Sequence, residues 1–367
     1  MMGSSGLFLS EGLVESNSNA RVDRILHDIH ADSPLSSGIS LVNFPKFDGS
    51  SVDALDFSGL PTGTHKYYKA IRAIRAFLQK NDQDVLVAIS SGNYAQALKA
   101  VAEAVDRKVV LVTSFEGGLH NCNYLRGDCT STVPIEDLQD AFSIAIGNGS
   151  FEKSTRRNVR DLTGKDLVRA YSAWRLQSGD VLPEEVQVWN ATNLLDLESL
   201  EYGSISSDRF TYGVELGDSY DYVFCPNGSG ELLYSLMCDP KLKDAVFYGI
   251  SPFGHPSITG STFEEDYRGS SADKLCSPTY SILNTHLRNK IRRLESGVPN
   301  LKILDISERE IGAAADFARV HGFSLESSAS VPFAFFDSNF RIRTGLQMPV
   351  GKKVLLVLTG NGALDRI

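Results

Sequence analysis

The first candidate for chemistry is Lys66, which lies between a glycine-bearing turn and a run typical of a helix in SGLPTGTHKYYKA, residues 58–70. A lysine amine becomes a nucleophile toward a carbonyl group when burial or neighbouring positive charge favours its neutral form. A solvated lysine near the start of a helix would give the same pattern. A chemical role for Lys66 therefore depends on whether other segments supply the rest of a site.

Three further segments rich in glycine and small polar residues each follow a predicted buried strand. They are ISSGNYAQA at 89–97, CPNGSGELL at 225–233 and LTGNGALD at 358–365. Ligands of α/β proteins bind beyond the carboxyl ends of the parallel strands. We therefore expect the three turns to face a common cleft.

Two of these turns have the composition of anion-binding loops. Gly228 and Gly230 allow successive backbone N–H groups to converge at the start of the next predicted helix, which suits a phosphate. Ser90 and Ser91, with backbone N–H groups at another helix start, could hold a carboxylate. An ordinary strand-to-helix turn and an ordinary helix cap are the alternatives, and neither segment decides between them by itself.

The spacing of apolar residues predicts an α/β fold. A strand at 84–90, a helix at 92–106 and a strand at 107–113 form a unit typical of a parallel sheet, because parallel neighbours need a crossover connection. Similar alternation follows downstream and ends in a strong strand at 352–360. We expect two three-layer α/β domains with mainly parallel, twisted sheets and the ligand in the cleft between them.

The chain is expected to divide into three parts. The segment 1–40 would pack on the larger domain, residues 41–160 would form the smaller domain with Lys66, and residues 161–367 would form the larger domain with the loop after 225. No repeat of fixed period suggests another architecture.

The overall composition excludes several classes of function. A formal charge of −9 argues against a nucleic-acid partner. No apolar run is long enough to cross a membrane, and the first residues lack the pattern of a secretory signal, so a cytoplasmic location is expected. The five scattered cysteines lack the spacing of a metal site. His27 and His30 are spaced about one helical turn apart, as metal ligands can be, but no third ligand is suggested nearby, so we expect no metal.

The motifs PTGTHK, SSGN, PNGSGE and LTGNG occur in this order along the chain. The order resembles the tryptophan-synthase-like, or fold type II, class of pyridoxal-phosphate enzymes, and within it the threonine synthases. Their motifs read NPTGSFKDRG, SSGNT, NPxRLEGQKT, PxGNGG and LTGxGLKD, against LPTGTHKYYKA, SSGNY, RNVRDLTGKDL, PNGSGE and LTGNGALD here. The resemblance covers about residues 40–367.

The resemblance implies roles for individual residues. Lys66 would hold pyridoxal 5'-phosphate as a Schiff base and, once released by substrate, act as the general base at Cα. Asn93 would hydrogen-bond the phenolic oxygen of the cofactor, and Thr359 would offer its hydroxyl to the pyridine nitrogen. The phosphate would be bound by Asn227, Gly228, Ser229, Gly230 and the N–H of Glu231. The substrate carboxylate would be bound by Ser90, Ser91, Gly92 and Asn93, with backbone help from Tyr94.

The expected partner of the pyridine nitrogen bears on the reaction. A neutral hydroxyl such as that of Thr359 does not hold this nitrogen protonated as a carboxylate would, so the ring is a weaker electron sink. We therefore expect β- or γ-elimination or replacement on a small amino acid with a side-chain leaving group, as in a threonine synthase. A cysteine-synthase-like β-replacing synthase or a serine/threonine dehydratase is the alternative. The resemblance also implies a homodimer.

The chain departs from the family pattern at several positions. Tyr67 and Tyr68 replace an Asp-Arg pair, and Tyr94 replaces a small residue, which would add bulk on the substrate side. These departures leave open a function of another class, a cofactor-free binding module that keeps the fold. Candidates for binding a second phosphate, on the substrate, are Lys153, Arg156, Arg157 and Arg160, for which a solvated basic loop is the alternative.

Three other residues near the motifs have two interpretations each. Glu326 matches a family segment that lines the cofactor face, although a carboxylate at a helix start also explains it. His65 would either shape the pocket or pack. Cys225 is more typical of a small buried residue than of a nucleophile.

Overall fold

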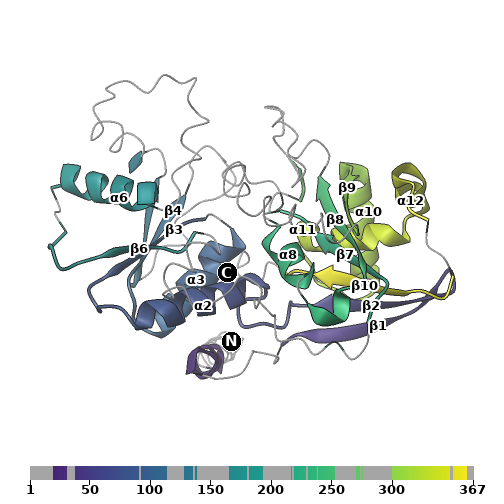
Figure 1. The fold of residues 1–367 in the computed structure, drawn as a ribbon, viewed down its shortest axis with the longest axis horizontal. Coiled ribbons are helices and arrows are strands. Elements are labelled where there is room, and N and C mark those ends of the chain that lie inside the picture. The colour runs from purple at the N-terminus through teal and green to yellow at the C-terminus, as the bar shows by residue number, and fades with distance from the viewer. Residues whose placement is uncertain are drawn as a thin grey trace, which may run out of the picture.

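Two β-sheets organise the protein, and the helices pack around them (Figure 1). The computed structural model describes residues 20–30, 38–90, 92–113, 128–134, 137–138, 165–179, 182–192, 216, 219–228, 230–237, 239–252, 270–272, 275, 300–347 and 350–361. Strands in both sheets run mainly parallel, as the alternation of strands and helices predicted. The expected α/β fold is therefore confirmed.

The six-stranded sheet combines strands from both ends of the chain. In spatial order they are β1 (Ser40–Phe47), β2 (Ser50–Asp56), β10 (Lys353–Leu358), β7 (Tyr222–Pro226), β8 (Val246–Pro252) and β9 (Leu301–Ile306). β1 is antiparallel to β2, and all other neighbours are parallel. β10 lies inside the sheet and is buried after its first residue, which explains its continuous apolar run.

The four-stranded sheet is wholly parallel. Its spatial order is β5 (Thr130–Pro134), β4 (Val109–Thr113), β3 (Val85–Ile89) and β6 (Val188–Asn190). α3 (Asn93–Ala104) is the crossover from β3 to β4. The crossover places the start of α3 at the carboxyl end of β3, where α/β proteins bind their ligands.

The helices divide between the two sheets. α2 (Lys66–Leu78), α3 and α6 (Lys165–Gln177) lie with the four-stranded sheet (Figure 1). α8 (Glu231–Met237), α10 (Glu308–Val320), α11 (Ser327–Ser330) and α12 (Ser338–Thr344) lie with the six-stranded sheet (Figure 1). None of the helices that the structure describes is long and apolar enough to cross a lipid bilayer.

Sheet membership differs from the division expected at residue 160. β1 and β2 belong to the six-stranded sheet, whereas α6 and β6, which follow residue 160, belong with the four-stranded one. The chain therefore passes between the sheets more than once. Strand pairing depends on contacts between residues far apart in the chain, and the local apolar pattern does not contain that information.

The N-terminal segment also lies differently from the expectation. Its described part, a helix over residues 20–30, contacts α2 through a 2.8 Å hydrogen bond from the Tyr67 hydroxyl to Asp28 Oδ2. Ile25 and Ile29 of this helix are buried in the same cluster as α2.

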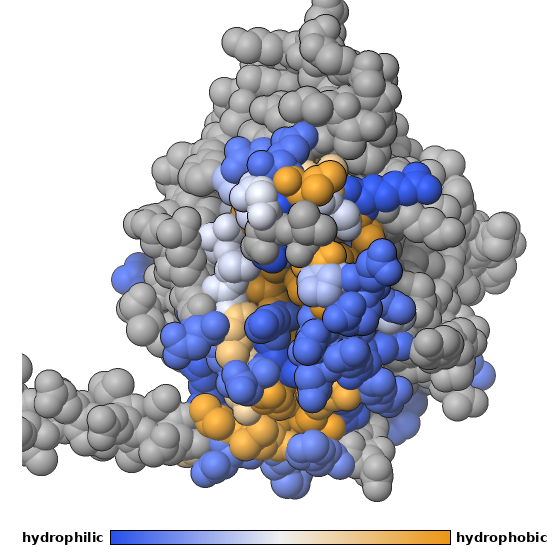
Figure 2. All heavy atoms as spheres, turned by 90° about the vertical axis from the view of Figure 1, so that its left-hand side faces the viewer, coloured by the Kyte–Doolittle hydropathy of each residue, from blue (hydrophilic) through white to orange (hydrophobic). Residues whose placement is uncertain are grey.

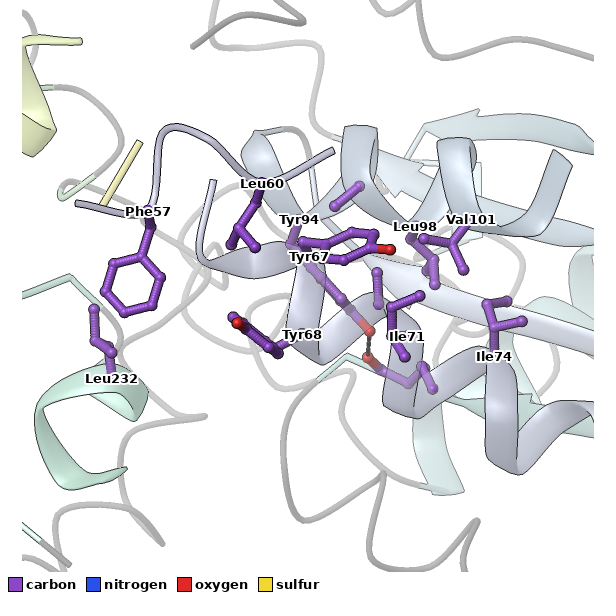
Figure 3. Close-up of a cluster of buried hydrophobic side chains, with 14 of the residues drawn as sticks. Phe57, Leu60, Tyr67, Tyr68, Ile71, Ile74, Tyr94, Leu98, Val101 and Leu232 are labelled. Atoms are coloured by element: carbon purple, nitrogen blue, oxygen red, sulfur yellow. Dashed lines mark hydrogen bonds between the residues drawn. The ribbon is translucent and has the colours of Figure 1, made fainter. Parts of the chain in front are cut away.

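A shared apolar core joins the two sheets. One cluster of buried side chains contains Leu86 and Leu111 from the four-stranded sheet together with Val223 and Val357 from the six-stranded one. Figure 3 shows part of it, with Phe57 beside Leu232 of α8 and the apolar residues of α2 beside those of α3. Because it contains residues of both sheets, this cluster fixes the two sheets against each other. In contrast, the face of the molecule on the side of the four-stranded sheet is mostly hydrophilic in its described part, with smaller groups of apolar residues (Figure 2).

Candidate active site

The turn that carries Lys66 is fastened to the end of β10. Lys66 is the first residue of α2, and Gly63 in the preceding turn has a φ of 67°, which favours glycine. The backbone N–H of His65 donates to Thr359 O at 3.0 Å, and that of Asn361 donates to Gly63 O at 3.0 Å. Two of the four motifs therefore lie in direct contact, although almost 300 residues separate them.

The side chain of Lys66 reaches the third motif. Its Nζ lies 3.4 Å from Oε2 of Glu231, the residue that directly follows the PNGSG loop. A second lysine, Lys69, contacts the same carboxylate at 3.1 Å and 3.2 Å. Lys69 also donates to Thr192 O at 2.7 Å, and its Nζ lies 4.3 Å from the centre of the Tyr94 ring. One buried carboxylate thus holds two amines from a single turn of α2.

The carboxylate of Glu231 is ionised in this setting. Burial by itself raises the pKa of the carboxyl, but the charges of Lys69 and Lys66 outweigh it and lower the pKa to about 2. These three groups together carry one net positive charge. That charge lies beside the loop that the sequence predicted as a phosphate site, and it favours an anion there.

His65 is uncharged at neutral pH. Burial, followed by the neighbouring Lys66 charge, lowers its pKa to about 3, although a hydrogen bond to the Thr359 carbonyl opposes the shift. Its Nδ1 lies 3.1 Å from Thr359 O. Because a carbonyl oxygen only accepts, Nδ1 carries the proton and Nε2 is left as an acceptor. His65 therefore packs as a neutral ring and adds no cation beside Lys66.

Asn93 of the SSGN motif contacts a residue on the side of the six-stranded sheet. Asn93 Nδ2 donates to Glu326 Oε1 at 2.7 Å, and Glu326 lies at the start of α11. An amide nitrogen has two N–H groups, and no other described residue takes the second. Asn93 can therefore donate to a ligand while Glu326 holds its side chain.

The PNGSG loop is held by β8. Asn227 is fully buried, its backbone N–H donates to Ile250 O at 2.8 Å, and its Nδ2 donates to Ser251 Oγ at 2.8 Å. Gly230 has a φ of 80°, so the loop requires glycine at that point. Gly228 is described and partly exposed, whereas Ser229 lies outside the described residues.

The remaining residues predicted to bind substrate lie at the start of α3. Ser90 is buried, and its backbone N–H donates to Val112 O at 3.0 Å; Gly92 is the residue before the helix. Tyr94 is 3% exposed, and its hydroxyl donates to Ala191 O at 2.7 Å. Ser91 lies outside the described residues.

The three tyrosines that depart from the family pattern are interior residues. Tyr67 and Tyr68 on α2 and Tyr94 on α3 are buried in the core (Figure 3). Tyr67 bonds Asp28, and Tyr68 packs against the edge of Phe57. Their bulk therefore fills the interior, because helical spacing points these positions of α2 and α3 inward. The ring of Tyr94 also lies against Lys69.

The interpretation of Cys225 as a buried residue agrees with the structure. It is fully buried, and burial raises the pKa of its thiol. His27 lies 3.3 Å from Asp28, and within the described residues no three His, Cys, Asp or Glu side chains gather as a metal site would require. Thr359 is buried at the end of β10, and no described residue hydrogen-bonds its hydroxyl.

Two features of the site were missed by the sequence reasoning. Lys69 was not singled out, and Glu231 was expected to act only through its N–H. The signal for Lys69 was a charged residue on α2 among buried neighbours, three positions after Lys66. The basic candidates Lys153, Arg156, Arg157 and Arg160 lie outside the described residues.

Comparison with known proteins gives matches in structure only. A scan against protein-family models finds no match, and neither does a search of curated proteins. Among solved structures, a fungal L-serine ammonia-lyase from Rhizomucor miehei is 15% identical with a TM-score of 0.55, covering 88% of this chain and 93% of that one. A pyridoxal 5'-phosphate-dependent aspartate racemase is 14% identical with a TM-score of 0.59, covering 94% and 95%.

A third match adds another type of reaction. The O-acetylserine dependent cystathionine beta-synthase from Helicobacter pylori is 15% identical with a TM-score of 0.52, covering 93% of this chain and 96% of that one. Because the sequence identities are only 14–15%, these matches show the fold alone, and they extend over nearly the whole chain. The chain therefore has the fold of the fold type II pyridoxal-phosphate-dependent enzymes.

Proposed function

We propose that this protein is a pyridoxal-phosphate-dependent enzyme that eliminates or replaces a leaving group on the side chain of an amino acid. The observation that carries the proposal is the convergence of the four motifs. Direct contacts link Lys66 to Glu231 and His65 to Thr359, while Tyr94 lies against Lys69. Segments from distant parts of the chain thus meet beside the partly exposed side chain of Lys66, as a covalently held cofactor requires.

The residues around Lys66 suit the cofactor in charge and in hydrogen bonding. The amine would bind the aldehyde, and the loop from Asn227 to Gly230, beside one net positive charge, would hold the phosphate. The second N–H of Asn93 would donate to the phenolic oxygen, and the Thr359 hydroxyl would meet the pyridine nitrogen. When bound, pyridoxal phosphate supplies an electron sink for negative charge at the substrate Cα.

The choice of elimination or replacement rests on Thr359. A hydroxyl at the ring nitrogen gives a weaker electron sink than a carboxylate, and this favours reactions in which a leaving group departs quickly. The amine of Lys66 would then serve as the base at Cα. Threonine-synthase-like chemistry is our first assignment, with β-replacement and dehydration as alternatives within the same class.

Reduction of the bound cofactor tests the covalent link. Wild-type protein incubated with pyridoxal phosphate should gain visible absorbance, and borohydride should then fix one cofactor on the peptide that contains Lys66. Lys66→Ala should lose both signals, while Lys46→Ala, at an exposed lysine, should keep them. Wild-type protein that remains colourless and unlabelled would reject the proposal and favour a cofactor-free binding module.

Product analysis then identifies the reaction. The cofactor-loaded enzyme is incubated with phosphohomoserine, serine or an activated serine, with and without a sulfur nucleophile. Threonine and phosphate from phosphohomoserine would support the first assignment, and a 2-oxo acid with ammonia would indicate a dehydratase. A change only in the chirality of the amino acid would contradict the proposed reaction class.

A further inference from the structure

We infer that Glu231 is a positioning residue that determines which of two adjacent lysines reacts with an aldehyde. It occupies the amine of Lys69 and leaves that of Lys66 available. The inference deepens the proposed function, and it rests on that function for its biological purpose. Its physical content, a difference in reactivity between two amines, can be measured without the cofactor.

The two lysines start from nearly equal positions. They are three residues apart on α2, which places them on neighbouring positions of one helix face. Both amines lie within 3.4 Å of the same carboxylate. An aldehyde that reaches one amine therefore comes close to the other, so proximity alone does not select Lys66.

The surroundings of the two amines differ, and this difference favours reaction at Lys66 over Lys69. An ammonium group has three N–H donors, and Lys69 directs its donors to Thr192 O and to both oxygens of Glu231. The Tyr94 ring covers it as well. Its side chain is 6% exposed, so the charged amine would have to lose these partners before it could react.

Lys66 is held much more loosely. Its contact with Glu231 is the longest of the three at 3.4 Å, and no other described side chain bonds its amine. Its side chain is 17% exposed. Glu231 thus orients the Lys66 amine through one contact and keeps the neighbouring lysine out of the reaction.

Reductive methylation with formaldehyde and cyanoborohydride reads this difference directly. The neutral amine adds to the carbonyl carbon, a proton passes from nitrogen to oxygen, and one water leaves to give an imine. Cyanoborohydride then donates a hydride to the carbon, and solvent supplies a proton to the nitrogen. A short pulse followed by mass spectrometry of peptides gives the rate at each lysine.

In wild-type protein we expect Lys66 to be methylated at least about tenfold faster than Lys69. Lys66→Ala should leave Lys69 slow, because Glu231 and Thr192 still occupy it. The double variant Lys66→Ala with Glu231→Gln should speed methylation of Lys69 about tenfold or more. With Glu231→Asp, which keeps the charge, Lys69 should react faster than in wild type but more slowly than in the Gln variant.

Two controls separate positioning from general loosening. The rates at Lys46, which is exposed, and at Lys99, which is partly exposed on α3, should not change in any variant, and circular dichroism checks folding. If the Gln variant does not fold, the methylation rates of Lys69 in Lys66→Ala and in Glu231→Asp still test the inference. Rapid methylation of Lys69 in Lys66→Ala, or no change at Lys69 in folded Glu231 variants, would overturn the inference, whether or not the protein binds pyridoxal phosphate.

Discussion

The two sides of the candidate site contribute opposite kinds of polar group. The side formed by α2 and α3 supplies N–H donors from Lys66, Lys69 and Asn93. The side of the six-stranded sheet supplies the carboxylates of Glu231 and Glu326. Because each donor meets an acceptor from the opposite side, charge complementarity aligns the two halves, while the apolar core holds them together.

This difference also explains why a buried cluster of charges is tolerated. Two amines and a carboxylate in the interior would each be costly alone, since removal from water destabilises an unpaired charge. Paired across the junction, they satisfy one another and remain fixed in place. The same arrangement makes the site sensitive to the loss of any one member.

Removal of the carboxylate of Glu231, which the two lysines share, should have the largest effect on stability. Glu231→Ala leaves the Lys69 charge buried without its ion pair, so we expect the free energy of unfolding to fall by about 3–5 kcal/mol. Urea denaturation measures this loss. Adding Lys69→Met removes the stranded charge and should restore part of the stability.

A matched control comes from a partly exposed carboxylate. Glu103 pairs with Lys99 at 3.9 Å on α3, and Glu103→Ala should change the free energy of unfolding by less than about 0.5 kcal/mol. Equal losses for the two alanine variants would show that Glu231 and its lysines do not form a coupled buried group.

Burial and the neighbouring charge of Lys66 should also oppose protonation of the His65 ring. The folded protein keeps the His65 pKa near 3, against 6.5 for a free histidine, so the unfolded chain binds a proton first as the pH falls. The stability that this provides is full above pH 6.5 and is lost progressively toward pH 3, at up to about 1.4 kcal/mol per pH unit.

Replacement by an uncharged residue isolates this contribution. Between pH 7.5 and 5.5, wild-type protein should lose about 1.4 kcal/mol more stability than His65→Asn, whose amide can still donate to the Thr359 carbonyl. The shifted range of Glu231 lies lower, between 4.5 and about 2, so it does not interfere. Identical losses in the two proteins would mean that His65 takes up its proton in the folded state as readily as in the unfolded one.

The sequence predicted the elements better than their arrangement. The strands that became β3, β4, β7 and β10 have continuous apolar runs, and these runs are local signals. The placement of β1 and β2 beside β10 was not predicted, because it depends on pairing with a strand near the other end of the chain. The N-terminal helix was misplaced for the same reason.

The site shows the same limit on a smaller scale. Lys66, Asn93 and Thr359 could be proposed because each lies in a motif that can be recognised along the chain. The ion pair between Lys69 and Glu231 could not, since it joins residues 162 positions apart that belong to no common motif. Local spacing suggests which residues can react, whereas their partners become visible only once the two sides are brought together.

A smaller effect should appear at the second contact between the two sides. The amide of Asn93 donates one hydrogen bond of 2.7 Å to the carboxylate of Glu326, and this contact is only partly buried. Alanine at either position should therefore lower the free energy of unfolding less than Glu231→Ala does. In a double-mutant cycle of Asn93→Ala and Glu326→Ala we expect a coupling energy of about 1–2 kcal/mol by urea denaturation. Strictly additive losses would show that this contact does not join the two sides, and the ion pair at Glu231 would then carry the polar alignment without it.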